Sequence, residues 1–244
     1  MARTNNAGFS APIEYFGQGS NAKLKLVSSR DGQQQTVLEG TDENGDIVSR
    51  DVSGDTLAPE GVYEVAGDLT HADLPAIGSL STVAAVIDGS STTVSIRLAS
   101  ITIETGAGQP PKVTLAGKSV EPSAAAGRTF AVPPAALCKH YKAQDALAAA
   151  TLTGAACALT RCVTVISAEV GTATKGNSPI SSDCWGGRAV ATLTVQQYGS
   201  NAPAVAAAAG WDVTKGLSQS NQDAAYVEWV CELTKSLTAT EPAA

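Results

Sequence analysis

The stretch that decides the fold is Thr92–Thr105, with the sequence TTVSIRLASITIET. Apolar and polar residues alternate along it, as in a β-strand with one buried face. The alternating apolar residues are Val94, Ile96, Leu98, Ile101 and Ile103. They change face once, at Ala99–Ser100, and a shift of one residue is what a β-bulge produces. We therefore predict a long, bulged strand that projects from its sheet or bends between two sheets.

Shorter alternating segments surround this stretch and predict further strands. Turn sequences such as Asn44-Gly45 and Asp88-Gly89 separate them, and both dipeptides favour tight hairpins. The predicted strands are residues 23–29, 34–39, 46–52, 61–66, 81–87, 112–120, 159–170, 188–198 and 226–237. We expect the first four to form a meander of short hairpins. The strands on either side of Thr92–Thr105 should pair with it as three consecutive antiparallel strands.

One helix is predicted, at about Pro134–Ala150, because proline is tolerated in the first helical turn and Ala and Leu dominate the rest of the segment. The Ala-rich run 202–209 fits either a short helix or a loop. The fold class is therefore mainly β: an antiparallel β-sandwich or small barrel with long hairpins and one flanking α-helix.

The predicted organisation has four parts. Residues 121–136 contain three prolines and a run of small residues, which marks a linker. The parts are an N-terminal arm (1–22), a β-domain (23–120), the linker (121–136) and a helix with a second β-region (137–244). The last part can also pack with residues 23–120 as one domain.

Composition argues against some functions. The formal net charge is −7 at pH 7, and no basic patch is present, whereas binding nucleic acid through phosphates needs clustered Lys and Arg. No segment has a signal peptide's apolar run or the ~20 apolar residues of a membrane span. We expect a soluble protein, made in the cytoplasm, with no membrane partner.

Residues for catalysis or metal binding are scarce. The chain has two histidines, of which His71 beside Asp73 is best interpreted as a loop contact. Asp42–Asp46 does not follow the order of calcium ligands in an EF-hand. The five cysteines match no zinc or redox spacing, so we expect reduced, buried thiols, with a disulfide at Cys184 left open. We predict no enzyme activity, cofactor or metal.

The pattern resembles phage virion proteins, in particular tail tube proteins and their relatives. The resemblance rests on the long strands Val94–Glu104 and Lys112–Val120, the helix after Pro133-Pro134, and the later pair Cys162–Val170 with Arg188–Gln197. It covers most of residues 60–237. It implies a virion structural protein, synthesised in the host cytoplasm, that self-assembles into stacked homo-oligomeric rings. Other virion proteins would contact it, and DNA would pass through the lumen without specific binding.

In such a subunit the long strand is the candidate assembly element, because a ring can close when strands of neighbouring subunits pair at their edges. The candidate assembly residues are Val94, Ile96, Arg97, Leu98, Ile101 and Ile103.

Two alternatives remain open. A capsid decoration or tail-adaptor protein would explain the same residues. A protein of another class, a carbohydrate- or cell-binding β-domain, would use exposed aromatic rings among Trp185, Trp211 and Tyr198. Trp185 is the best candidate for this ligand platform because the following glycines leave its ring uncrowded, although a core tryptophan beside a turn fits equally well.

Overall fold

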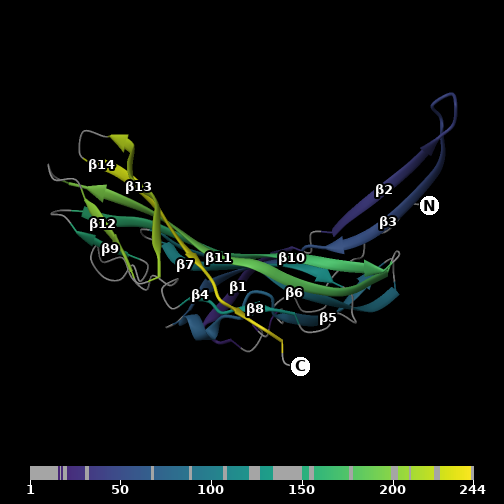
Figure 1. The fold of residues 1–244 in the computed structure, drawn as a ribbon, viewed down its shortest axis with the longest axis horizontal. Helices are drawn as coiled ribbons and strands as arrows, with labels where there is room; N and C mark the ends of the chain where they lie inside the picture. The colour runs from purple at the N-terminus through teal and green to yellow at the C-terminus, as the bar shows by residue number, and fades with distance from the viewer. Residues whose placement is uncertain are drawn as a thin grey trace.

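The fold is an elongated, twisted antiparallel sheet, with one hairpin extending from an end of it (Figure 1). It is seen in a computed structural model. The structure describes residues 16, 18, 21–30, 33–66, 69–87, 90–106, 109–120, 127–133, 150–153, 157–175, 178–198, 203–208, 210–222 and 226–242.

Strands account for most of the described residues, which confirms the mainly β prediction. They are β1 (Leu24–Arg30), β2 (Gln33–Thr41), β3 (Ile47–Leu57), β4 (Glu60–Val65), β5 (Leu80–Ile87), β6 (Ser90–Gly106), β7 (Gln109–Val120), β8 (Thr129–Phe130), β9 (Ala150–Thr153), β10 (Cys157–Lys175), β11 (Ser178–Gln197), β12 (Ala204–Ala207), β13 (Asp212–Gln222), β14 (Val227–Ser236) and β15 (Ala239–Thr240). A short 3-10 helix, η2, spans His71–Asp73.

Nine strands form the main sheet, in the order β1-β4-β7-β6-β10-β11-β14-β13, with β5 also paired to β6. Strands before and after the predicted linker meet directly in it, because β6 pairs with β10. In the described part of the chain the sheet is open, with β1 and β13 at its two ends, and does not close into a barrel.

The long strand β6 has the predicted bulge and a divided edge. Its pairing with β7 shifts register between Leu98 and Ser100. On the opposite edge, Ser100–Gly106 pairs with β10, but Ser90–Arg97 pairs with β5. The sheet therefore branches at residues 97–100 of β6, which we call the branch point. Beyond it, β10 and β11 leave β6 and continue to pair with each other as far as Lys175 and Ser178.

The core lies on the inner faces of these strands. Its largest apolar side chains with almost no exposure are Tyr63, Ile77, Ile96, Leu98, Ile101, Leu115, Ile166, Leu193 and Leu233. Burial of a large aliphatic side chain contributes roughly 1.5–3 kcal/mol to stability. Ser95 and Arg97, on the other face of β6, are also buried, so residues 94–98 of β6 are covered on both sides.

The predicted meander is wrong in its pairing. β1 pairs with β4, with Leu24 opposite Val65, and not with the next strand in sequence. The intervening β2 and β3 form a two-stranded sheet of their own. The turn sequences predicted the positions at which the chain reverses. They contain no information on which sheet the hairpin joins, so its separation from the main sheet was not predicted.

Two further predictions concern the helix at about Pro134–Ala150 and the Ala-rich run 202–209. Residues 134–149 of the predicted helix lie outside the described residues, and Ala150 begins β9. Part of the Ala-rich run is β12, which pairs with β9. Among the described residues, no helix has the length and apolar character needed to cross a membrane.

Candidate functional site

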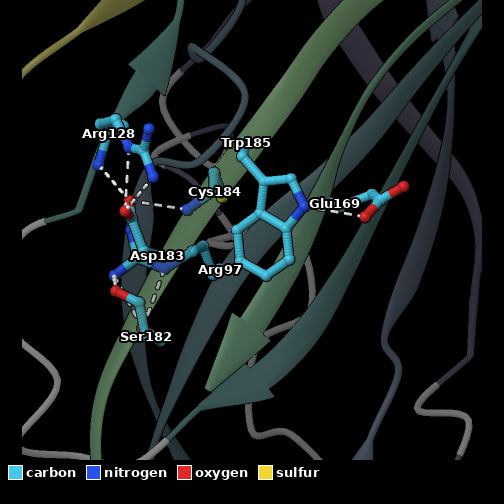
Figure 2. A network of polar contacts seen from close by, with 7 residues as sticks. All are labelled: Arg97, Arg128, Glu169, Ser182, Asp183, Cys184 and Trp185. Atoms are coloured by element: carbon cyan, nitrogen blue, oxygen red, sulfur yellow. Dashed lines mark hydrogen bonds and ion pairs between the residues drawn. The ribbon is translucent and has the colours of Figure 1, made fainter. Parts of the chain in front are cut away.

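Arg97 is buried at the branch point, with 1% of its surface exposed. Its Nε and Nη2 donate to Ser182 Oγ, at 3.1 and 2.8 Å, and Nη2 also donates to the Ser182 carbonyl at 3.2 Å. Nη1 donates to the Gly78 carbonyl at 2.7 Å. Arg97 thus connects β6 to β11 where backbone pairing between β6 and β10 has ended (Figure 2).

A second arginine contacts the next residue of β11. Arg128 donates to Asp183 Oδ2 from Nε at 2.9 Å and from Nη2 at 2.6 Å, and its backbone N–H donates to Oδ1 at 2.8 Å. The hydrogen bonds from the Arg128 side chain lower the pKa of Asp183 to about 2. The same contact raises the pKa of Arg128. This pair ties the segment before β8 to β11.

Trp185 lies on the same strand and is 42% exposed. Its indole Nε1 donates to Glu169 Oε2 of β10 at 2.8 Å (Figure 2). The ring lies against Gly171, because a Cβ added there would come within 2.1 Å of the indole Cη2. Only glycine at position 171 allows the indole to lie this close to β10.

A β-bulge separates these residues from the rest of β11. Ser167 is opposite Arg188 and Glu169 is opposite Trp185, so Gly186 and Gly187 face a single residue of β10. Gly186 has a φ of +65°, a conformation that favours glycine. The residues of β11 before the bulge alternate: Ser182 and Cys184 are buried, whereas Asp183 and Trp185 face outward.

The six candidate assembly residues are all buried: Val94, Ile96, Arg97, Leu98, Ile101 and Ile103. Five of them are apolar core side chains, and Arg97 is bonded at the branch point. The physical reason is that β6 lies inside the sheet, with its apolar side chains in the core and Arg97 covered on the opposite face. These side chains hold the chain itself together and are not exposed for contact with another molecule.

The candidate platform residues divide in their exposure. Trp185 and Tyr198 are exposed, at 42% and 52%, but Trp211 is buried at 4%. Tyr198 lies 6.2 Å from the Tyr226 ring, centroid to centroid, in a tilted arrangement. Trp211 packs in the hydrophobic core, so it is excluded from a stacking surface.

Among the described residues, no three His, Cys, Asp or Glu side chains lie together as metal ligands would. Cys162, Cys184 and Cys231 are buried thiols outside any disulfide, and burial raises the pKa of the Cys231 thiol to about 11. Asp73 accepts hydrogen bonds from Lys23 and Thr70, which lower its pKa. Burial raises the pKa of the Cys184 thiol as well, so Cys184 and Cys231 are protonated at neutral pH and behave as small apolar groups.

Sequence reasoning identified Trp185 but missed its partners. The Gly186-Gly187 pair was a usable signal, because glycines inside a strand often mark a bulge. Alternation before that bulge would have placed Asp183 outward with Trp185. Nothing local in the sequence links Arg128 to Asp183, since 55 residues separate them.

No family model matches the chain, and no curated protein is similar to it in sequence.

Proposed function

We propose that the protein is a self-assembling structural subunit of a phage virion, with the role of a tail tube protein that forms stacked rings around a DNA conduit. The observation that carries the proposal is the β2–β3 hairpin. Its strands, of nine and eleven residues, pair only with each other in the described part of the chain, and the hairpin extends beyond the main sheet (Figure 1).

An isolated two-stranded hairpin gains little stability in water, and no third strand pairs with β2 or β3 in the described part of the chain. Ile47, at the start of β3, is 58% exposed. A hairpin of this length therefore favours a partner, and a second copy of the same subunit would supply one in a ring or between stacked rings.

The open ends of the main sheet also support assembly. β1 and β13 contain no proline, and each exposes a valine, Val27 and Val213. Contacts between two different surfaces of identical subunits are head-to-tail, and they close into rings when the rotation allows. Both strands carry bulges, which limit indiscriminate pairing at an edge.

The charge of the chain is compatible with a conduit. A net charge of −7 gives a surface that repels phosphates on average and so lets DNA pass without adhesion. The proposal needs no catalytic group.

The test is the mass of the purified protein over a concentration series, followed by negative-stain imaging of large species. We expect rings or tubes. In a deletion variant, a short Gly-Ser turn replaces residues 33–57. This replacement is feasible because Arg30 and Glu60 are direct partners in the main sheet. This variant should keep the main sheet, seen by circular dichroism, and lose the tubes.

The outcomes separate the candidate roles. A monomer at every concentration overturns the proposal. A small closed oligomer that never stacks favours the capsid decoration or tail-adaptor role. If the variant without the hairpin still forms tubes, the hairpin is not the assembly element.

A further inference from the structure

We propose that the outward surface formed by Trp185, Glu169 and Arg128 is a binding platform for a neutral β-1,4-linked pyranoside. We call these three residues the Trp185 platform. The inference goes beyond the assembly role and does not depend on it.

The indole is held in position before any ligand arrives. The Gly171 backbone lies against the ring, and Glu169 accepts the Nε1 hydrogen bond at 2.8 Å. The exposed 42% of Trp185 is then available for stacking. Because the side chain is already fixed, binding loses less conformational entropy than it would with a free indole.

Polar groups lie on both sides of the ring (Figure 2). On one side, Glu169 uses Oε2 for the indole, which leaves Oε1 as an acceptor. On the other side in this view, Arg128 is held by outward-facing Asp183 of β11 through Nε and Nη2, and Nη1 has no partner among the described residues and can donate. A flat apolar surface between an acceptor and a donor matches a sugar ring, whose edge carries hydroxyl groups and whose face carries C–H bonds.

The chemistry of the surface narrows the class of sugar. A β-1,4-linked glucopyranoside has equatorial substituents, so both of its faces present axial C–H bonds that can stack on an aromatic ring. Arg128 offsets the charge of Asp183, so the Glu169 carboxylate leaves the surface with a net negative charge, which disfavours acidic sugars. One stacked ring gives weak binding, on the order of a millimolar Kd, and many copies in an assembly would strengthen attachment through avidity.

The competing explanation is that Trp185 has only a structural role, in which the indole covers Gly171 and stabilises the β10–β11 hairpin. A ligand titration separates the two, because a purely structural tryptophan would not respond to added sugar. Trp211 is buried and Trp229 is partly buried, so Trp185 is the most exposed of the three indoles.

The experiment is a fluorescence titration of the purified full chain with triacetylchitotriose and with cellotriose. We expect a change in emission that saturates in the millimolar range with at least one sugar. Trp185→Ala should abolish it, and Trp229→Phe should keep it. Glu169→Gln, whose amide oxygen can still accept from the indole, should bind within about threefold of the wild type, whereas Glu169→Ala should bind more weakly.

Circular dichroism and urea unfolding of each variant show whether it is folded. No saturable response to either sugar in the folded wild type overturns the proposal. An unchanged response in folded Trp185→Ala also overturns it, because the sugar would then bind elsewhere. Assembly into rings or its failure affects neither outcome, since emission can be read from both states.

Discussion

At the scale of single residues, two arginines connect β11 to β6 and to the segment before β8, with which β11 has no backbone pairing in the described part of the chain. Arg97 bonds to Ser182 and Gly78 inside the protein, and Arg128 bonds to Asp183 at its surface. A buried hydrogen bond matters chiefly because its loss leaves a polar group without water or partner. The two arginines should therefore differ in their contribution to stability.

We predict that Arg97→Met lowers the free energy of unfolding by about 3 kcal/mol, because the Gly78 carbonyl and Ser182 lose their buried donor and each such group costs about 1–3 kcal/mol. Urea denaturation measures this change. Arg161→Met is the control: Arg161 pairs with Glu104 on the exposed surface of the same sheet, and its loss should cost less than about 1 kcal/mol. Equal losses in the two variants would contradict this assignment.

The pH dependence of stability tests the contribution of the Arg128–Asp183 pair. The pKa of Asp183 is about 2 in the folded chain, below about 3.9 in an unfolded one. Its contribution to stability is therefore complete above about pH 4 and is lost as the pH falls toward 2. We expect Asp183→Asn to be less stable than the wild type at pH 7, with the difference shrinking over that interval.

Urea unfolding at several pH values provides the measurement. Asp73 also has a lowered pKa and contributes in the same direction, so Asp73→Asn serves as a parallel control. A stability difference for Asp183→Asn that stays constant from pH 5 to about pH 2 would falsify the role given to the Arg128 pair.

At the scale of strands, the sequence predicted the positions of the strands better than it predicted which strands pair with each other. Alternation located β6 and its bulge at Ala99, because a one-residue change of face is visible in the residues themselves. The pairing of β6 with β10 joins segments about 60 residues apart, and no short-range pattern encodes it. β13 was missed because its sequence, DVTKGLSQSNQ, has almost no apolar alternation and lies at an exposed edge.

The candidate site was predicted less completely than the fold. The alternation pattern put Arg97 on the polar face of the strand, opposite Val94, Ile96 and Leu98, and Arg97 was named among the candidate assembly residues. The structure buries it, because β5 and the β10–β11 hairpin divide one edge of β6. That division depends on tertiary pairing, which the pattern does not contain.

The β10–β11 hairpin offers a test at this scale. In Gly171→Ala the new Cβ would meet the Trp185 ring at 2.1 Å, so the indole has to move. We expect a loss of about 1–3 kcal/mol, typical of overpacking, and a shift in tryptophan emission. Gly216→Ala on β13 is the control, because nothing lies within 4 Å of its Cβ position. A neutral Gly171→Ala would show that the indole does not rest on β10.

At the scale of the whole molecule, stability should be uneven. The main sheet has nine strands and a continuous core, whereas the β2–β3 hairpin has two strands. Elements with few packed neighbours open at low free energy.

We predict that backbone amides of β2 and β3 exchange hydrogen faster than those of β6 in the isolated subunit. In an assembled ring the hairpin amides should become protected, while those of β6 change little. Hydrogen exchange read by mass spectrometry measures both. Equal protection of the hairpin in the isolated and assembled forms would show that it does not contact a neighbour.

The divided edge of β6 also determines how the molecule yields to force. A pull that lifts the tip of the β10–β11 hairpin away from β5 would concentrate at the branch point, where the Arg97 contacts are the first to carry load. After the Arg97 contacts break, the backbone pairs between β6 and β10 open one at a time, beginning with Ser100 and Ser167. A pull along the axis of β6 instead loads the hydrogen bonds to β7 and β10 together, in shear. The protein should therefore be stiff to a pull along the axis of β6 and compliant to a pull that lifts the β10–β11 hairpin.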